Sequence, residues 1–389
     1  MLYQLKQKMV NWVDGMKISS EHLKQTEDYF IDVVRDATNM RLTEHNFGLL
    51  PPYRGEKLSS DFEITERISN HVEIELRRCN AITPGGCRIT FNPVDSSDYL
   101  RLDYPFEQEV AATEGEDGNL YWDVILVVRP FDRIPLGAPD PEETPPRHPD
   151  AGKSYHLYIK PAGEINSEEF GMHHLLIGRV TKTADRYEVD SSYIPPCTSM
   201  GSHPDLKGYY EQFGKYFNDI EISSHKIIQK IHEQESKSST IANNIKLVCE
   251  HLLTYTAAVY FNFRNTGRNY VPVEIINTFS SLAHTAFVSI NFINKKQKEE
   301  MLQYFYEWSD ITPGNLMAIL TDMLEATYKH YDIRGMMDKT GHFLSEFSRL
   351  WIKLSTLEYI GQHKENVVVA QKTPKVEVVT RQSGWTIID

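Results

Sequence analysis

The chain has 389 residues, of which 40% are hydrophobic, and a formal net charge of -13 at pH 7. This length allows two or three domains with separate cores, and the composition is that of a folded globular protein rather than a disordered one. The carboxylates are concentrated between residues 103 and 150. An acidic surface repels nucleic acid and anionic lipid, so we expect neither as a partner.

The cysteines form no Cys-x-x-Cys pair, which favours a reduced, cytoplasmic chain. They are Cys79, Cys87, Cys197 and Cys249. The first two flank a Pro-Gly-Gly turn, where their thiols can approach each other across a hairpin. We find no signal peptide, and the most apolar windows, 247–263 and 279–293, lack the ~20 uninterrupted apolar residues of a membrane crossing. The sequence therefore predicts no direct membrane insertion.

The first predicted element is a helix over residues 21–40, preceded by a Trp and a Gly-Met pair within residues 10–18. This stretch has no nucleophile, no metal-ligand spacing and no phosphate loop, which is typical of a structural anchor. Trp12 suits a binding anchor, because a Trp side chain brings a large area with few rotatable bonds. It equally suits a plug in the core of the adjoining domain.

The first half of the chain is predicted to be mostly β. Residues 71–77 alternate apolar and charged side chains, as in a strand with one solvated face. Residues 121–128 form an apolar run typical of a strand buried on both faces. Residues 130–149 contain seven prolines, which predicts a stiff exposed loop. Further short strands are predicted over residues 155–159, 174–180 and 186–190.

After Pro195 and Pro196 the period of the pattern changes. From Leu206 onward, apolar side chains recur at alternating steps of four and three, which keeps them in one stripe on a helix. The stripe consists of Leu206, Tyr210, Phe213, Phe217, Ile220, Ile227 and Ile231, with Ser224 as its polar member. It either faces a bundle core within the chain or continues into a neighbouring chain. Further helices are predicted over residues 240–263, 272–293, 295–308, 313–331 and 338–360.

These elements predict an α+β protein in three parts. A β-rich, sandwich or barrel-like domain occupies residues 1–203, with the first helix packed on it. An α-helical bundle follows over residues 204–361. The tail over residues 362–389 contains strand-like runs but is too short to bury a core of its own.

Residues with catalytic or metal-binding potential are sparse. His173 and His174 are adjacent on a predicted strand, so they point to opposite faces, and no Cys, Asp or Glu joins them at a metal spacing. Gly85 and Gly86 lack the rest of a phosphate loop and fit a turn with positive φ. We therefore predict no catalytic residue, no metal and no cofactor.

A hydrolase built on the β domain is one alternative. It requires a deep pocket that gathers His156, His174 and carboxylates from residues 103–150.

Two motifs carry a resemblance to a known family. The first follows the pattern Val-x-Trp-x-Glu-Gly-Met-x-Leu-x-x-x-His-x-x-Gln. Its matching residues are Val10, Trp12, Gly15, Met16, His22 and Gln25, with Asp14 for the Glu and Ile18 for the Leu. The second is an apolar-x-Arg-Val strand at residues 175–180, followed by Tyr-Ile-Pro-Pro at residues 193–196. A Pro-Gly turn at residues 81–86 is a weaker third match.

In these motifs the chain resembles the TssK-type baseplate subunits of bacterial type VI secretion systems, over roughly residues 10–210. The resemblance implies a non-enzymatic adaptor of a contractile injection machine. Its β-rich shoulder would bind other baseplate wedge subunits, and its helical neck would form a homotrimer. The far end of the neck or the tail would meet an envelope-side partner. The candidate partner-interface residues are Trp12, Gly15, Met16, Ile18 and His22.

The chain also departs from the family pattern. Lys17 and residues 19–21 stand where the family often has Phe and an Arg-Pro-Gln run. The family's further C-terminal β-rich head looks missing or reduced, which puts docking to the usual membrane complex in doubt. A phage-tail-like receptor-binding or adaptor protein with the same architecture is a second alternative.

Overall fold

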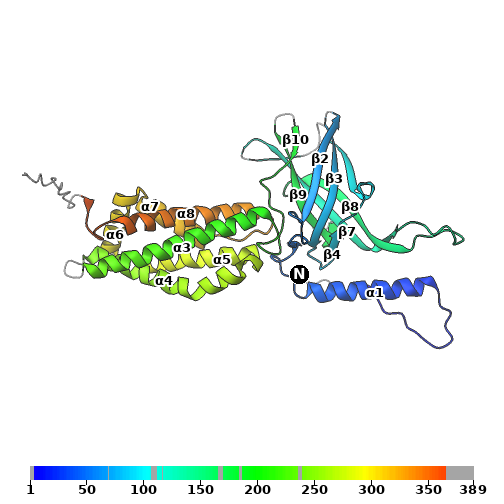
Figure 1. The fold of residues 1–389 in the computed structure, drawn as a ribbon, viewed down its shortest axis with the longest axis horizontal. Coiled ribbons are helices and arrows are strands. Elements are labelled where there is room, and N and C mark those ends of the chain that lie inside the picture. The colour runs from blue at the N-terminus through cyan, green and yellow to red at the C-terminus, as the bar shows by residue number, and fades with distance from the viewer. Residues whose placement is uncertain are drawn as a thin grey trace, which may run out of the picture.

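The computed structural model is an elongated molecule, with a β-rich part at one end and a helical bundle at the other (Figure 1). It describes residues 4–68, 70–106, 112–115, 117–164, 170–183, 186–234 and 239–364. The arrangement confirms the predicted α+β class. The predicted tail lies outside the described residues from residue 365 onward.

The β-rich part is a sandwich of two antiparallel sheets that share one core. The first sheet contains β1 (Gly48–Leu49), β2 (Ser60–Ile68), β3 (His71–Ile82), β4 (Arg88–Phe91) and β5 (Leu100–Pro105). β3 is its central strand and pairs with each of the others. The predicted alternating strand over residues 71–77 therefore forms the first half of the longest strand in this sheet.

The second sheet contains β6 (Thr113–Glu114), β7 (Leu120–Leu136), β8 (Asp150–Pro161), β9 (His174–Thr183) and β10 (Arg186–Val189). β7 pairs with β6, β8 and β9, and β10 extends the sheet beyond β9. Residues 122–128 of β7 are all buried. Alternate side chains of this run enter the main core and a smaller cluster on the other face, which confirms the strand buried on both faces.

The predicted proline-rich loop over residues 130–149 is wrong in its first part. β7 continues through Pro130 and Pro135 and ends only at Leu136. The ladder between β7 and β8 shifts register between Arg129 and Arg133, and a bulge of this kind accommodates a proline that has no N–H to donate. The exposed loop is therefore confined to the tip of a long β7–β8 hairpin, which projects away from the bundle (Figure 1).

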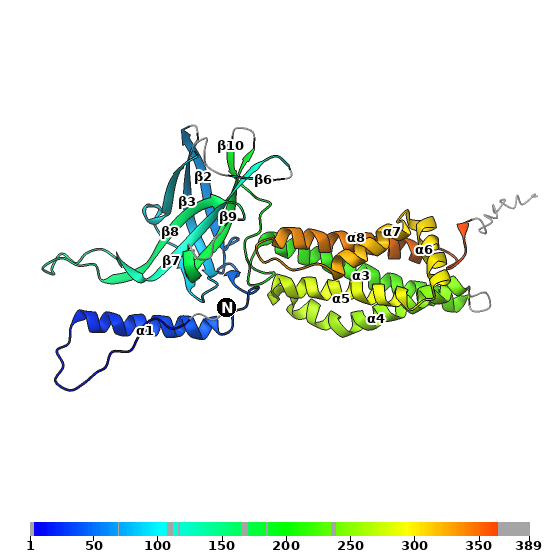
Figure 2. The ribbon, with the colours of Figure 1, turned by 180° about the vertical axis from the view of Figure 1, so that it is seen from behind.

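The helices are α1 (Ser20–Asn39), α3 (Pro204–Glu233), α4 (Thr240–Thr266), α5 (Pro272–Asn291), α6 (Lys295–Ser309), α7 (Pro313–Leu324) and α8 (Ile333–Thr356). Short 3-10 turns occur at η1 (Ser96–Asp98), η2 (Gly171–His173) and η4 (Gly267–Asn269). α3, α4, α5 and α8 run side by side along the long axis (Figure 2). Pro204, Pro272 and Pro313 lie in first turns, where a missing N–H is tolerated.

Two predicted helix boundaries are wrong. The helix predicted over residues 313–331 ends at Leu324, and the next begins at Ile333 rather than at residue 338. The chain between them crosses to the sandwich, where the His330 Nε2–H donates to Phe47 O at 2.8 Å. Asp332 then starts α8 by accepting the Gly335 N–H at 3.1 Å. The crossing depends on a tertiary contact, whereas the Asp332 cap is local to the start of α8.

The predicted apolar stripe of α3 faces the interior of the bundle. Each of its apolar residues is at most 8% exposed in the single chain. The rings of Phe213 and Phe217 both lie 5.5 Å from that of Phe279 on α5. Ser224 is also buried, and its hydroxyl donates to Ile220 O at 2.8 Å. The stripe is therefore covered by other helices of the same chain.

The sandwich and the bundle are joined by backbone pairing as well as by a shared core. The Leu49 N–H donates to Pro196 O at 2.7 Å, and the Met200 N–H donates to Tyr270 O at 2.9 Å. One continuous set of buried apolar side chains runs through both parts. Packing of this kind makes the junction stiff.

Candidate partner-binding surface

Four of the five predicted interface residues lie in the loop that leads into α1, and His22 lies in the first turn of the helix, at the end of α1 away from the bundle (Figure 1). Trp12 and Ile18 are 49% and 63% exposed. The interpretation of Trp12 as a core plug is therefore wrong. Gly15 has a φ of +80°, within a turn in which the Met16 N–H donates to Val13 O at 3.3 Å. Glycine adopts this left-handed conformation without strain.

Two other motif residues hold the loop to the helix. His22 lies in the first turn of α1, and its Nδ1 accepts the Ser19 N–H at 3.2 Å. The Trp12 and His22 ring centroids are 6.1 Å apart. The Gln25 side chain donates from Nε2 to Lys8 O at 3.3 Å. His22 and Gln25 thus shape the loop, while Trp12 is presented to solvent.

α1 turns its polar side towards the sandwich. Asp32, Arg35 and Asn39 are only 1–3% exposed. The Arg35 Nε donates to Asp32 Oδ1 at 2.7 Å, and its Nη1 donates to Gly85 O at 3.1 Å. The Asn39 amide donates to Pro84 O at 3.0 Å. The β3–β4 turn is therefore the docking point of the helix.

Gly86 lets this turn approach the helix. Its φ is +85°, and a Cβ there would lie 2.6 Å from Arg35 O. Any larger residue would force the turn and α1 apart. The prediction of a glycine turn with positive φ is confirmed.

The same contacts determine the charge of Asp32. Burial alone would raise the pKa of this carboxyl group, but N–H groups of Gln7 and Lys6 and the Arg35 guanidinium donate to it. Together these hydrogen bonds hold the pKa of Asp32 below its ordinary value. The buried Asp32–Arg35 pair is therefore charged at neutral pH. Removing either side chain would leave the other as a buried charge without a counter-charge.

The outward side of α1 is apolar. Leu23, Phe30 and Val34 are 56%, 60% and 66% exposed. Their spacing of seven and four residues places them in one stripe, which we call the α1 apolar face. An amphipathic helix normally buries its apolar stripe, and here the orientation is reversed. The sequence contains this spacing, but a spacing does not indicate which side of a helix faces the core.

A groove of about 790 Å³ lies between α1, β4 and the β7–β8 hairpin. Ile31, Phe91 and Ile134 contribute apolar side chains to its wall. Arg133 on β7 donates to Asp28 Oδ1 on α1 at 2.7 Å, which ties the hairpin to the helix. We call the loop over residues 10–18, the α1 apolar face and this groove the distal surface. Exposed apolar surface of this kind marks sites of protein association.

A second cavity, of about 760 Å³, bears on the hydrolase alternative. It brings together Asp123, His174 and Ser192, whereas His156 is not among its lining residues. The Ser192 hydroxyl donates to Asp190 rather than to His174. A nucleophilic serine requires a base within hydrogen-bonding reach, and these side chains do not form that pair.

In the part of the chain that the structure describes, no cluster of three or more His, Cys, Asp or Glu side chains is arranged to hold a metal ion. None of the described helices combines the length and hydropathy that a bilayer crossing requires. All four cysteines are buried free thiols. Cys79 lies opposite Phe91 in the β3–β4 ladder, so the suggested approach of Cys79 to Cys87 across the hairpin is wrong.

Comparisons with known proteins show which solved structures share this fold. No protein-family model matches the chain, and no curated protein matches it in sequence. A chain of the solved baseplate complex from the type VI secretion system is similar in structure, with a TM-score of 0.51 and 12% identity, over 89% of this chain and 99% of that chain.

Two solved TssK structures are also similar. TssK from the type VI secretion system of EAEC, in complex with a nanobody, has a TM-score of 0.46 and 12% identity, over 86% of this chain and 100% of that chain. A crystal structure of TssK has a TM-score of 0.45 and 13% identity, over 87% of this chain and 69% of that chain. Of these three matches, the chain of the baseplate complex is the one whose fold agrees with the predicted resemblance at a TM-score above 0.5.

Proposed function

We infer that this protein is a structural subunit of a baseplate of the type VI secretion kind, and that it binds neighbouring wedge subunits through the distal surface. The observation that carries this proposal is the α1 apolar face. A buried ion pair holds the polar side of α1 against the sandwich, so the apolar side is left for another protein to cover. The fold shared with a chain of a solved baseplate complex supports the same assignment.

The architecture suits a mechanical link. A sandwich and a bundle that share one core resist bending between them. We propose that this rod lies in the cytoplasm and connects wedge subunits at the distal surface to an envelope-side partner at the far end of the bundle or at the tail. Such a role uses buried contact area and involves no bond-making step.

The proposed homotrimer needs a surface other than the α3 stripe, because that stripe is already buried within the chain. We place its contact on the outer side of α4 and α5. Phe261 and Phe292 are 72% and 68% exposed there, and a groove of about 590 Å³ lined by Tyr255 and Val288 lies between the two helices. Light scattering tests this placement. Wild-type protein at micromolar concentration should be trimeric, and the Phe261→Ser/Phe292→Ser variant should be monomeric.

Affinity purification of the tagged full-length chain tests the main proposal. Other baseplate subunits should co-purify with the wild type, and the Phe30→Ser/Val34→Ser variant should lose them while remaining folded. Ile222→Ser is the matched control, because Ile222 is 44% exposed on α3 of the bundle, outside the distal surface. Retention of every partner by the α1 variant would count against the distal surface, and a wild-type preparation without baseplate proteins would count against the function.

A further inference from the structure

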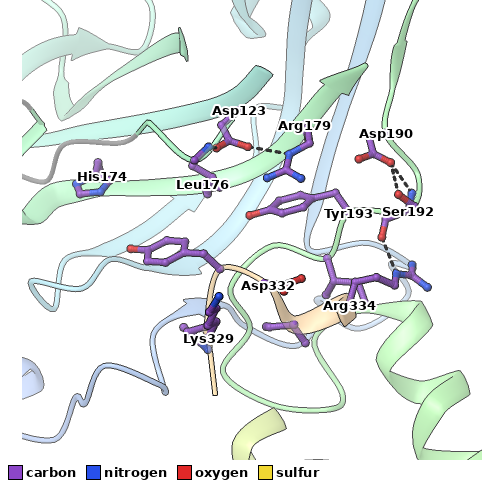
Figure 3. A pocket seen from close by; sticks show the side chains of 15 residues that line it. Asp123, His174, Leu176, Arg179, Asp190, Ser192, Tyr193, Lys329, Asp332 and Arg334 are labelled. Atoms are coloured by element: carbon purple, nitrogen blue, oxygen red, sulfur yellow. Dashed lines mark hydrogen bonds and ion pairs between the residues drawn. The ribbon is translucent and has the colours of Figure 1, made fainter. Parts of the chain in front are cut away.

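The cavity of about 760 Å³ lies where the sandwich meets the bundle (Figure 3). β7 supplies Asp123 and β9 supplies Arg179, while the segment after β10 supplies Tyr193. The segment before α8 and its first turn supply Lys329 and Arg334. Cavities of about 300–1,000 Å³ commonly hold small ligands or single side chains of a partner.

Tyr193 has an unsatisfied hydroxyl at this cavity. The residue is 8% exposed, and its buried Oη has no hydrogen-bond partner among the described residues. Figure 3 shows the hydroxyl end of the ring directed towards the side where His174 and Lys329 lie. A buried hydroxyl without a partner is destabilising, so native proteins nearly always satisfy it. A ligand in the cavity would supply the missing partner.

Arg179 lies over the face of the Tyr193 ring. Its guanidinium carbon is 4.2 Å from the centroid of the Tyr193 ring. Asp123 accepts the Nε–H of Arg179 at 2.9 Å, which leaves the two Nη groups for other acceptors. A guanidinium group presents these donors in a planar fork that matches the two oxygens of a carboxylate.

The acidic side chains that line the cavity already accept hydrogen bonds from other groups of the chain. Asp123 accepts the Gly163 N–H at 2.9 Å in addition to the Arg179 Nε–H. Asp190 accepts the backbone and side-chain groups of Ser192, and Asp332 caps α8. Acidic and basic residues are equal in number among the cavity residues, so a ligand is recognised by local geometry rather than by a strong overall potential.

The basic side chains of the cavity differ in how many hydrogen bonds they already make. Arg334 donates to Ser192 O, to the Tyr209 hydroxyl and to Asp205. The Lys329 carbonyl accepts the Asp332 N–H at 3.0 Å, but the Lys329 ammonium makes no hydrogen bond or ion pair with a described residue. The groups left to serve a ligand are therefore mainly donors, from Tyr193, Arg179 and Lys329.

We propose that this cavity binds a carboxylate group, held by the Tyr193 hydroxyl, the Nη groups of Arg179 and the Lys329 ammonium. Arg179 and Tyr193 belong to the sandwich side and Lys329 to the bundle side, so a bound carboxylate ties the two parts together. The carboxylate comes from a small organic acid or from an acidic side chain of a peptide. This proposal does not depend on the baseplate assignment, because it concerns a different surface.

Isothermal titration of the full-length protein tests the site. Succinate and citrate form one arm, and the capped peptide Gly-Glu-Gly forms the other, with capped Gly-Gln-Gly as its uncharged counterpart. We expect saturable binding in one arm, which identifies the source of the carboxylate. Tyr193→Phe and Lys329→Gln should each weaken it by about tenfold or more, the usual loss for a hydrogen bond to a charged group. Tyr255→Phe removes a hydroxyl elsewhere in the chain and should leave binding unchanged.

Two outcomes would overturn the proposal. One is the absence of saturable binding in both arms, or, where only the peptides bind, equal affinity for the Glu and Gln peptides. The other is unchanged affinity in both cavity variants, with circular dichroism showing that they are folded. Since Tyr193→Phe deletes a hydroxyl that no described residue uses, this variant should fold as the wild type does.

Discussion

Buried His330 should make the junction between sandwich and bundle sensitive to acid. It is 4% exposed, and its Nε2 lies 2.8 Å from Phe47 O. Because a carbonyl only accepts, Nε2 carries the proton and Nδ1 is free to accept the Tyr328 hydroxyl, which lies 2.8 Å away. The neutral ring is fully satisfied. A second proton at Nδ1 would oppose the Tyr328 donor and place a charge in the core.

The magnitude follows from the shift in pKa. Burial lowers the pKa of His330 from 6.5 to about 4, despite the opposing hydrogen bond to Phe47. A lowered folded pKa means that the stabilisation is present above pH 6.5 and is lost as the pH falls from there towards about 4. Between about pH 7 and about pH 5, this one residue should reduce the free energy of unfolding by about 2 kcal/mol.

Urea unfolding of wild type and His330→Gln at both pH values measures this effect. Glutamine keeps a neutral donor for Phe47 O but cannot take up a proton, so the loss on acidification should be smaller in the variant by about 2 kcal/mol. His225→Gln, at an exposed position on α3, should leave the wild-type pH dependence intact. An equal loss in wild type and His330→Gln would show that the buried histidine does not control the acid response.

Three further predictions concern packing and hydrogen bonding. Phe217→Ala should lower the free energy of unfolding by about 3–5 kcal/mol in urea titrations, because Phe217 is fully buried in the bundle, and a loss below 1 kcal/mol would refute its core role. Arg35→Ala should leave Asp32 charged and unpaired, with a loss of about 3–5 kcal/mol and faster hydrogen exchange across α1; unchanged exchange there would contradict the docking role of the pair. Tyr193→Phe should leave the melting temperature and the free energy of unfolding unchanged. Tyr255→Phe should lower the free energy of unfolding by about 1 kcal/mol, because the Tyr255 hydroxyl donates to Thr278 O at 2.6 Å. Equal losses in the two variants would contradict this difference.

Local patterns in the sequence were sufficient for the class of each half of the chain. The stripe from Leu206 to Ile231 predicted a helix with one buried side, and these residues are buried in α3. The apolar run at residues 121–128 predicted a strand covered on both faces, as β7 is. The glycine turn at residues 84–86 was also predictable. Each signal depends on residues that are neighbours in the sequence, where backbone geometry alone sets the period.

The orientation of α1 and the junction cavity were decided by tertiary structure. The spacing of Leu23, Phe30 and Val34 defines a stripe, yet Arg35 turns that stripe outward by bonding to a β-turn 50 residues further along the chain. The cavity likewise joins Arg179 to Lys329 from separate parts of the fold. Because no periodic pattern encodes which distant groups will neutralise a buried charge or meet across a domain junction, only the packed structure reveals these two surfaces.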